Sequence, residues 1–123
     1  MPARLRPADP AEAAAALARL RSGSAGDDDV RLLVRHFLGV LGARAPGRSV
    51  ELRVPPYAAV QVVGGLTHKR GRPPAVVETD PTTWIALAVG EVTWADAVRE
   101  GRVSAAGERS DLSAHLPLSD GES

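Results

Sequence analysis

The feature that most constrains the fold of this 123-residue chain is a change in the period of its apolar residues. From residue 30 to residue 41 they recur three or four positions apart, the spacing of one broad helical face. From residue 50 they alternate with charged residues, the spacing of a half-buried strand. A chain with both periods must pack helices against a sheet, which favours an α+β domain. The helical face comprises Val30, Leu33, Val34, Phe37, Leu38 and Leu41, and the strand face Val50, Leu52 and Val54.

Capping residues and helix breakers predict the other elements. Asp9, Pro10 and Glu12 indicate a helix start, and Ser22-Gly23 its end. Residues 22–29 are interpreted as a flexible acidic linker, whose Asp27, Asp28 and Asp29 are placed favourably at the positive end of the next helix. Pro55-Pro56 ends the first strand, because neither residue can donate to a ladder. Further strands are predicted at 57–63, 75–79 and 102–106. Helices are predicted to start at Asp80-Pro81 and at Thr93, followed by a last helical turn at 110–116 and a tail with no fixed structure from Pro117 onwards.

Gly39 lies inside the predicted long helix, where glycine costs about 1 kcal/mol relative to alanine. A close approach by the backbone of another element, or by a bound chain, would justify it. Neutral drift of the sequence is an equally good explanation.

Length and composition exclude several classes of function. A chain of this length forms one domain with a sizeable core. The absence of cysteine excludes thiol nucleophiles, thiolate-bound metals and disulfides. Fifteen basic residues balance fifteen acidic ones, so net charge favours neither nucleic acid nor an anionic membrane as a partner. No apolar run is long enough for a membrane span, and Glu12 and Arg19 interrupt the one faintly signal-like stretch, so we expect a cytoplasmic protein.

The candidates for catalysis or metal binding are few. His36, His68 and His115 are too widely spaced to share a helical face, so neither a metal nor another cofactor is expected. No serine lies in a nucleophile elbow. Glu78 and Asp80 could form an acid/base pair, but the first ends a predicted strand and the second caps a predicted helix. We therefore expect no enzyme.

The loop from Gly64 to Pro74 is rich in glycine, proline and positive charge. Its glycines do not form a phosphate loop, because no Lys-Ser/Thr pair follows and the loop leads into a strand. Within it, Lys69-Arg70-Gly71-Arg72-Pro73 resembles the AT-hook core, which lies in the minor groove of A·T-rich DNA. A single copy between two strands favours a charged hairpin loop. Binding of A·T-rich DNA, or of an anion or phospholipid headgroup, stays open as an alternative.

The order of motifs in the second half resembles the sterol carrier protein 2-like family, over about residues 28–118. The motifs are Thr79-Asp80-Pro81, Trp84, Leu87 to Gly90, Thr93 to Ala97, Gly101-Arg102-Val103, Gly107, and Leu112 to Leu116. The segment Arg53 to Gln61, with Val77 to Pro81, is similar to the bacterial, actinobacterial-type branch.

This resemblance implies an α+β domain with a mixed or antiparallel sheet of about five strands, backed by helices, and an apolar tunnel between them. It implies a non-catalytic carrier for a sterol, a fatty acid or an acyl-CoA. We divide the chain into an N-terminal alanine-rich helix and linker (1–27), the carrier-like domain (28–118) and a disordered tail (119–123). The residues expected to line the cavity are Phe37, Leu41, Val60, Val62, Trp84 and Leu87.

Two departures from the family limit what is carried over. Related bacterial proteins often have an N-terminal domain like metal-dependent maleylpyruvate isomerases, whereas this chain has one helix there. It also ends in Gly-Glu-Ser and not in a peroxisomal signal. A second class of function stays open: a scaffold or protein-interaction module in which the same six side chains only pack on each other. A cavity of roughly 300 Å³ or more favours the carrier, and a filled core favours the scaffold.

Overall fold

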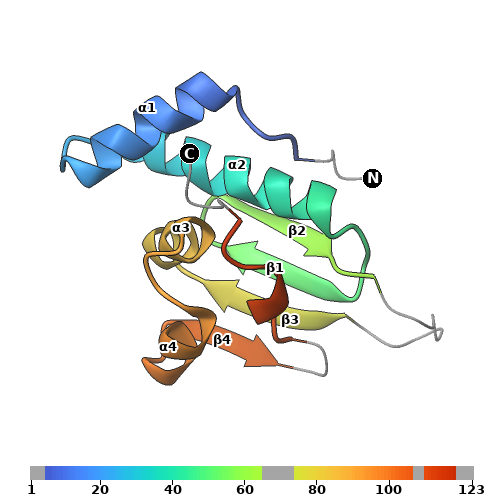
Figure 1. Ribbon diagram of the computed structural model, residues 1–123. Helices are drawn as coiled ribbons and strands as arrows, with labels where there is room; N and C mark the ends of the chain where they lie inside the picture. The colour runs from blue at the N-terminus through green and yellow to red at the C-terminus, as the bar shows by residue number, and fades with distance from the viewer. Residues whose placement is uncertain (1–4, 65–73, 107–109, 119–123) are drawn as a thin grey trace.

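Helices cover one face of a four-stranded sheet in the computed structural model, which describes residues 5–64, 74–106 and 110–118 (Figure 1). The α+β class and the mixed sheet are confirmed, with four strands among the described residues where the resemblance implied about five. None of the helices in this part of the chain is long and apolar enough to cross a membrane. The elements are α1 (Pro10–Arg21), α2 (Asp27–Arg44), β1 (Val50–Val54), β2 (Ala58–Val62), β3 (Ala75–Thr79), α3 (Pro81–Val89), α4 (Trp94–Arg99), β4 (Val103–Ala106) and the 3₁₀ turn η1 (Ser113–His115).

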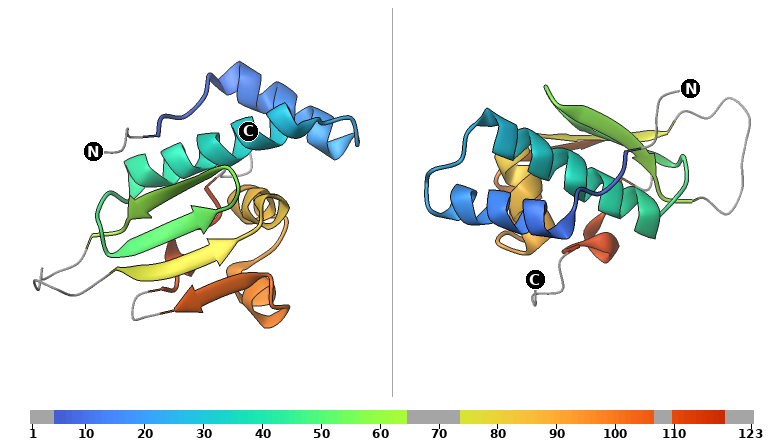
Figure 2. Two further views of the ribbon diagram at one scale, coloured as in Figure 1. Left: turned by 180° about the vertical axis from the view of Figure 1, so that it is seen from behind. Right: turned by 90° about the horizontal axis from the view of Figure 1, so that it is seen from above.

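The sheet has the strand order β2-β1-β3-β4, with β1 parallel to β3 and the two outer pairs antiparallel. Leu52 at its centre is in register with Val60 on β2 and with Val77 on β3. Alternate residues of β1 and β3 are buried on one face, which we call the inner face. No helix among the described residues covers the opposite face (Figure 2, left), where Arg53 and Glu78 are exposed.

Helix α2 lies on the inner face and buries the predicted apolar stripe, except for the half-buried Val30. It begins at Asp27, inside the predicted linker, so the prediction of a flexible segment up to Asp29 is wrong. The Asp29 carboxylate accepts a hydrogen bond from the Gly26 N–H at 3.2 Å, which satisfies a donor in the first turn. Acidic side chains there also interact favourably with the helix dipole.

The predicted caps of α3 and α4 are confirmed. The Asp80 carboxylate accepts a hydrogen bond from the Thr83 N–H at 3.1 Å, and Pro81 is the first residue of α3. Gly90 ends α3 in the left-handed conformation, at φ 84°. Thr93 caps α4 by accepting a hydrogen bond from the Asp96 N–H at 3.1 Å. These local signals fix where both helices begin.

Helix α1 and the segment before it lie on the side of α2 that faces away from the sheet (Figure 2). Asp9 caps α1, as predicted, and Ala13 and Ala16 are its buried residues. The preceding residues 5–9, here called the strap, cross α2 at Gly39. A Cβ atom on Gly39 would lie 2.7 Å from backbone atoms of Arg6 and Pro7. The close approach of another backbone therefore explains the glycine.

Residues 110–118, here called the closing segment, return across the helix-covered side of the sheet (Figure 1). The predicted last turn is limited to η1. Leu112 and Leu118 are each 1% exposed. The prediction of no fixed structure from Pro117 onwards is therefore wrong for Leu118, whose N–H donates to the Ala88 carbonyl at 2.8 Å. Residues 119–123, predicted to be a disordered tail, lie outside the described residues.

Candidate functional site

The six residues predicted to line a cavity come from three elements, and the fold brings them into one layer. Phe37 and Leu41 come from α2, Trp84 and Leu87 from α3, and Val60 and Val62 from β2. Five are buried, and Val60 is half-buried and packs against the same core. We call the buried side chains between the inner face and helices α2 and α3 the apolar layer. Their role in binding a ligand stays a prediction.

The polar groups that border the apolar layer are paired with one another. In the described part of the chain, the buried polar side chains are Thr79 and Thr83. The Thr79 hydroxyl donates to the Arg102 carbonyl at 2.8 Å. The Thr83 hydroxyl donates to the Asp80 carboxylate at 2.5 Å and accepts a hydrogen bond from the Arg102 guanidinium at 3.2 Å. An apolar molecule in this layer would therefore leave neither hydroxyl unpaired.

Trp84 connects the two helices of the layer. Its ring is 1% exposed, and its indole N–H donates to the Val34 carbonyl on α2 at 3.3 Å. The position follows from the sequence, because Trp84 lies one turn after the Asp80-Pro81 start, on the face of α3 that meets α2. Trp94 at the start of α4 is half-buried and lies nearer the surface than Trp84.

The closing segment was not among the predicted site residues, although it contributes to the apolar layer. Leu112 and Leu118 belong to the core cluster, and Leu116 packs against it. The Leu118 carbonyl accepts a hydrogen bond from the guanidinium of Arg44, at the end of α2. Leu112 and Leu116 are four positions apart, a helical spacing, but Leu118 does not continue it, so periodicity alone does not find all three. The available signal was the family resemblance, whose motifs already included Leu112 to Leu116.

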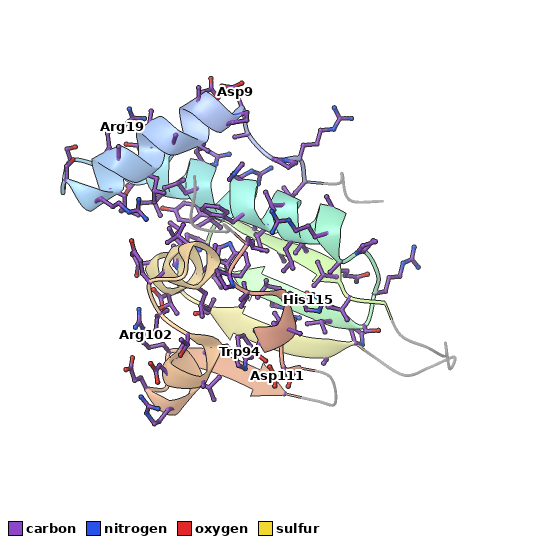
Figure 3. The ribbon with its side chains drawn as sticks, viewed as in Figure 1. Asp9, Arg19, Trp94, Arg102, Asp111 and His115 are labelled. Carbon is purple, nitrogen blue, oxygen red and sulfur yellow. The ribbon has the colours of Figure 1, made fainter. Side chains whose placement is uncertain are left out.

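The described histidines lie apart. His36 is half-buried, with its ring edge-on to Phe37, and its Nδ1 accepts a hydrogen bond from the Ala8 N–H of the strap at 2.9 Å. Burial lowers the pKa of His36 below its usual value. His115 lies on η1 (Figure 3). Helix α1, which carries the labels Asp9 and Arg19 in the same view, lies on the other side of α2. Within residues 5–64, 74–106 and 110–118, no group of three or more histidines and carboxylates could hold a metal ion. His68 lies outside these ranges.

The acidic pair Glu78 and Asp80 does not form an acid/base dyad. Glu78 is exposed near the end of β3, and Asp80 is the cap of α3. Burial raises the pKa of Asp80, but hydrogen bonds from Thr83 and Thr82 outweigh this effect and hold the pKa below its usual value. The carboxylate therefore stays ionised and bound to its own helix.

The AT-hook-like run from Lys69 to Pro73 lies outside the described residues. Binding of DNA or of an anion by this loop stays an alternative from the sequence.

The sequence model of a family described as a bacterial SCP ortholog matches residues 27–118. The match begins at the first residue of α2 and ends at Leu118, so it includes the sheet, α3, α4 and the closing segment. Helix α1 and the strap precede it. No curated protein matches the chain.

Proposed function

Because this chain belongs to the family of bacterial SCP orthologs, we propose that it is a non-catalytic carrier of a small apolar molecule. The ligand is a sterol, a fatty acid or a fatty acyl chain, as the resemblance to sterol carrier proteins implies. It binds in the apolar layer, among Phe37, Leu41, Val60, Val62, Trp84 and Leu87.

The observation that carries this proposal is the composition of the apolar layer. Its side chains are almost all aliphatic, and its two buried hydroxyls are already paired at the edge formed by α3 and β4. An apolar ligand therefore gains about 25 cal/mol for each Å² that it removes from water. It does so without leaving a buried polar group unpaired, which would cost free energy and oppose binding.

Leucines of the closing segment lie in or against the core, so we propose that a ligand takes the room that this segment occupies. They are Leu112, Leu116 and Leu118. Three leucine side chains hold about as many carbons as a dodecyl chain, so an exchange of one for the other conserves the buried apolar volume. The segment is joined to the rest of the core by few backbone hydrogen bonds, that of Leu118 among them. We propose that a ligand enters by displacing it.

Titration with laurate while tryptophan fluorescence is recorded tests this proposal. We expect a saturable response from the wild type and from Trp94→Phe, and none from Trp84→Phe, because Trp84 is the tryptophan buried in the layer. Leu41→Trp should weaken binding by filling the layer, although overpacking itself costs about 1–3 kcal/mol. Circular dichroism checks that each variant is folded. Saturable binding that neither Leu41→Trp nor Trp84→Ala alters would contradict this site.

A scaffold or interaction module on the same fold is the second candidate. The observation that favours it is the burial of Leu41 and Val62, whose side chains are fully covered by other atoms of the chain. Native mass spectrometry of the protein from its own host, followed by lipid extraction, discriminates the two functions. A co-purified lipid supports the carrier. Failure to bind any long-chain ligand, in the host or in titration, supports the scaffold.

A further inference from the structure

One charged side chain contacts the closing segment where that segment enters the apolar layer. Arg44, in the last turn of α2, donates from its guanidinium to the Leu118 carbonyl. The Leu118 N–H donates to the Ala88 carbonyl near the end of α3, and its side chain is 1% exposed. Leu118 thus places an apolar group in the core and a carbonyl oxygen on a guanidinium at the rim.

A fatty acid has the same arrangement of groups, with an apolar chain and a terminal oxygen head. The guanidinium of arginine binds a carboxylate in a two-point, charge-assisted geometry, which is stronger than its bond to a neutral carbonyl. Replacement of the Leu118 carbonyl by a carboxylate would therefore strengthen the contact with Arg44. A neutral alcohol or ester offers no such gain.

The charge of Arg44 is available for this role. Across residues 5–64, 74–106 and 110–118, the ion pairs of the structure do not include Arg44. Arg44 is exposed as a residue, so a head bound to it stays at the boundary with water. An ionised carboxylate there avoids most of the cost of desolvation.

We propose that the protein selects apolar ligands with a carboxylate head, which Arg44 binds in place of the Leu118 carbonyl while the ligand's chain replaces the leucines of the closing segment. Leu118 is then an internal competitor of the ligand. This inference rests on the proposed carrier function and adds to it the class of headgroup and the group that is displaced.

Binding of laurate and of methyl laurate at pH 8, measured on the full chain, tests the inference. We expect the wild type to bind laurate about tenfold more tightly than the ester, the difference between a charge-assisted and a neutral hydrogen bond. Arg44→Gln should reduce the ratio to about one, and Arg44→Lys should retain part of it. Arg48→Gln is the matched control, because it removes the same charge from an exposed arginine four residues further on and should keep the ratio.

Hydrogen exchange gives a second readout. Laurate should increase the exchange of the Leu118 amide in the wild type, because its bond to Ala88 breaks when the segment is displaced. Equal affinity for acid and ester in the wild type, which requires no variant, would overturn this inference and leave the carrier proposal standing. So would a Leu118 amide that stays protected at saturation. Failure of every lipid to bind would overturn both.

Discussion

The two sides of α2 are covered by very different surfaces. Towards the sheet, the helix buries five large apolar side chains in the core, where α2 packs against β2 and α3. On its other side, α1 contributes two buried alanines, with Leu17 and Leu20 half-buried. Each buried methylene is worth about 0.8 kcal/mol, so the alanine-based contact is far weaker per turn of helix. We call the strap and α1 (residues 5–21) the cover. The family match begins at α2, so the cover precedes it.

Polar contacts hold this cover in place. Arg19 and Asp29 form an ion pair at 2.7 Å, Arg21 and Glu91 another at 3.1 Å, and His36 accepts the hydrogen bond from the strap. Ion pairs at the surface contribute little to stability. The comparison teaches that one helix can be a core element on one side and a lightly covered surface on the other. We expect α1 and the strap to detach at a lower free energy than the core unfolds.

The largest effect is expected from Leu52→Ala, at the centre of the inner face. It leaves a cavity in the core and should lower the free energy of unfolding by roughly 2–5 kcal/mol in a urea titration. Leu17→Ala, in the half-buried face of α1, is the matched variant and should cost about 1 kcal/mol. Equal losses would contradict the difference between the two sides of α2.

Gly39→Ala should separate the cover from the core. Its Cβ would overlap the backbone of Arg6 and Pro7, so the strap must move away. The helix gains about 1 kcal/mol in propensity, which offsets most of the lost contact. We expect the amide of Ala8 to lose its protection from hydrogen exchange while the global stability changes by less than about 1 kcal/mol. A loss of protection throughout the sheet would show that the cover is part of the core.

Acid should loosen the strap through His36. Its pKa is lowered by burial in the folded protein, so the unfolded chain takes up a proton first as the pH falls below about 6.5. Stability is therefore complete above that pH and is lost as the pH falls through the lower folded pKa. His36→Asn keeps an acceptor for the Ala8 N–H but does not titrate. Thermal unfolding at pH 7.5 and pH 5 should show a larger loss for the wild type than for this variant, and identical losses would refute the role of His36.

The smallest effect is expected from Arg21→Gln. This variant removes the ion pair with Glu91, in which both side chains are about half exposed. The free energy of unfolding should change by no more than about 0.5 kcal/mol, measured in urea at low and at high salt. A larger, salt-sensitive loss would mean that this contact anchors α1.

Sequence reasoning was most successful where a signal is local. The caps Asp9, Asp80 and Thr93 each act on backbone groups within three residues, so their helices were predicted with correct starts. It was less successful at the start of α2, where the acidic residues were recognised as favourable for the next helix but were assigned to the linker before it, whereas the helix already begins at Asp27. The six layer residues were predicted because Phe37 and Leu41 repeat with a helical period and Val60 and Val62 with a strand period. Periodicity alone does not find Leu118.

The sequence by itself determined the α+β class, the order of the elements, and which face of each helix and strand is apolar. The tertiary structure alone decided the parallel pairing of β1 with β3, the crossing of the strap at Gly39 and the bond from Arg44 to Leu118. The physical reason is the range of the interactions. Periodicity and capping depend on residues within a few positions of each other, whereas Arg44 and Leu118 are 74 positions apart and meet because the sheet and helices place them together.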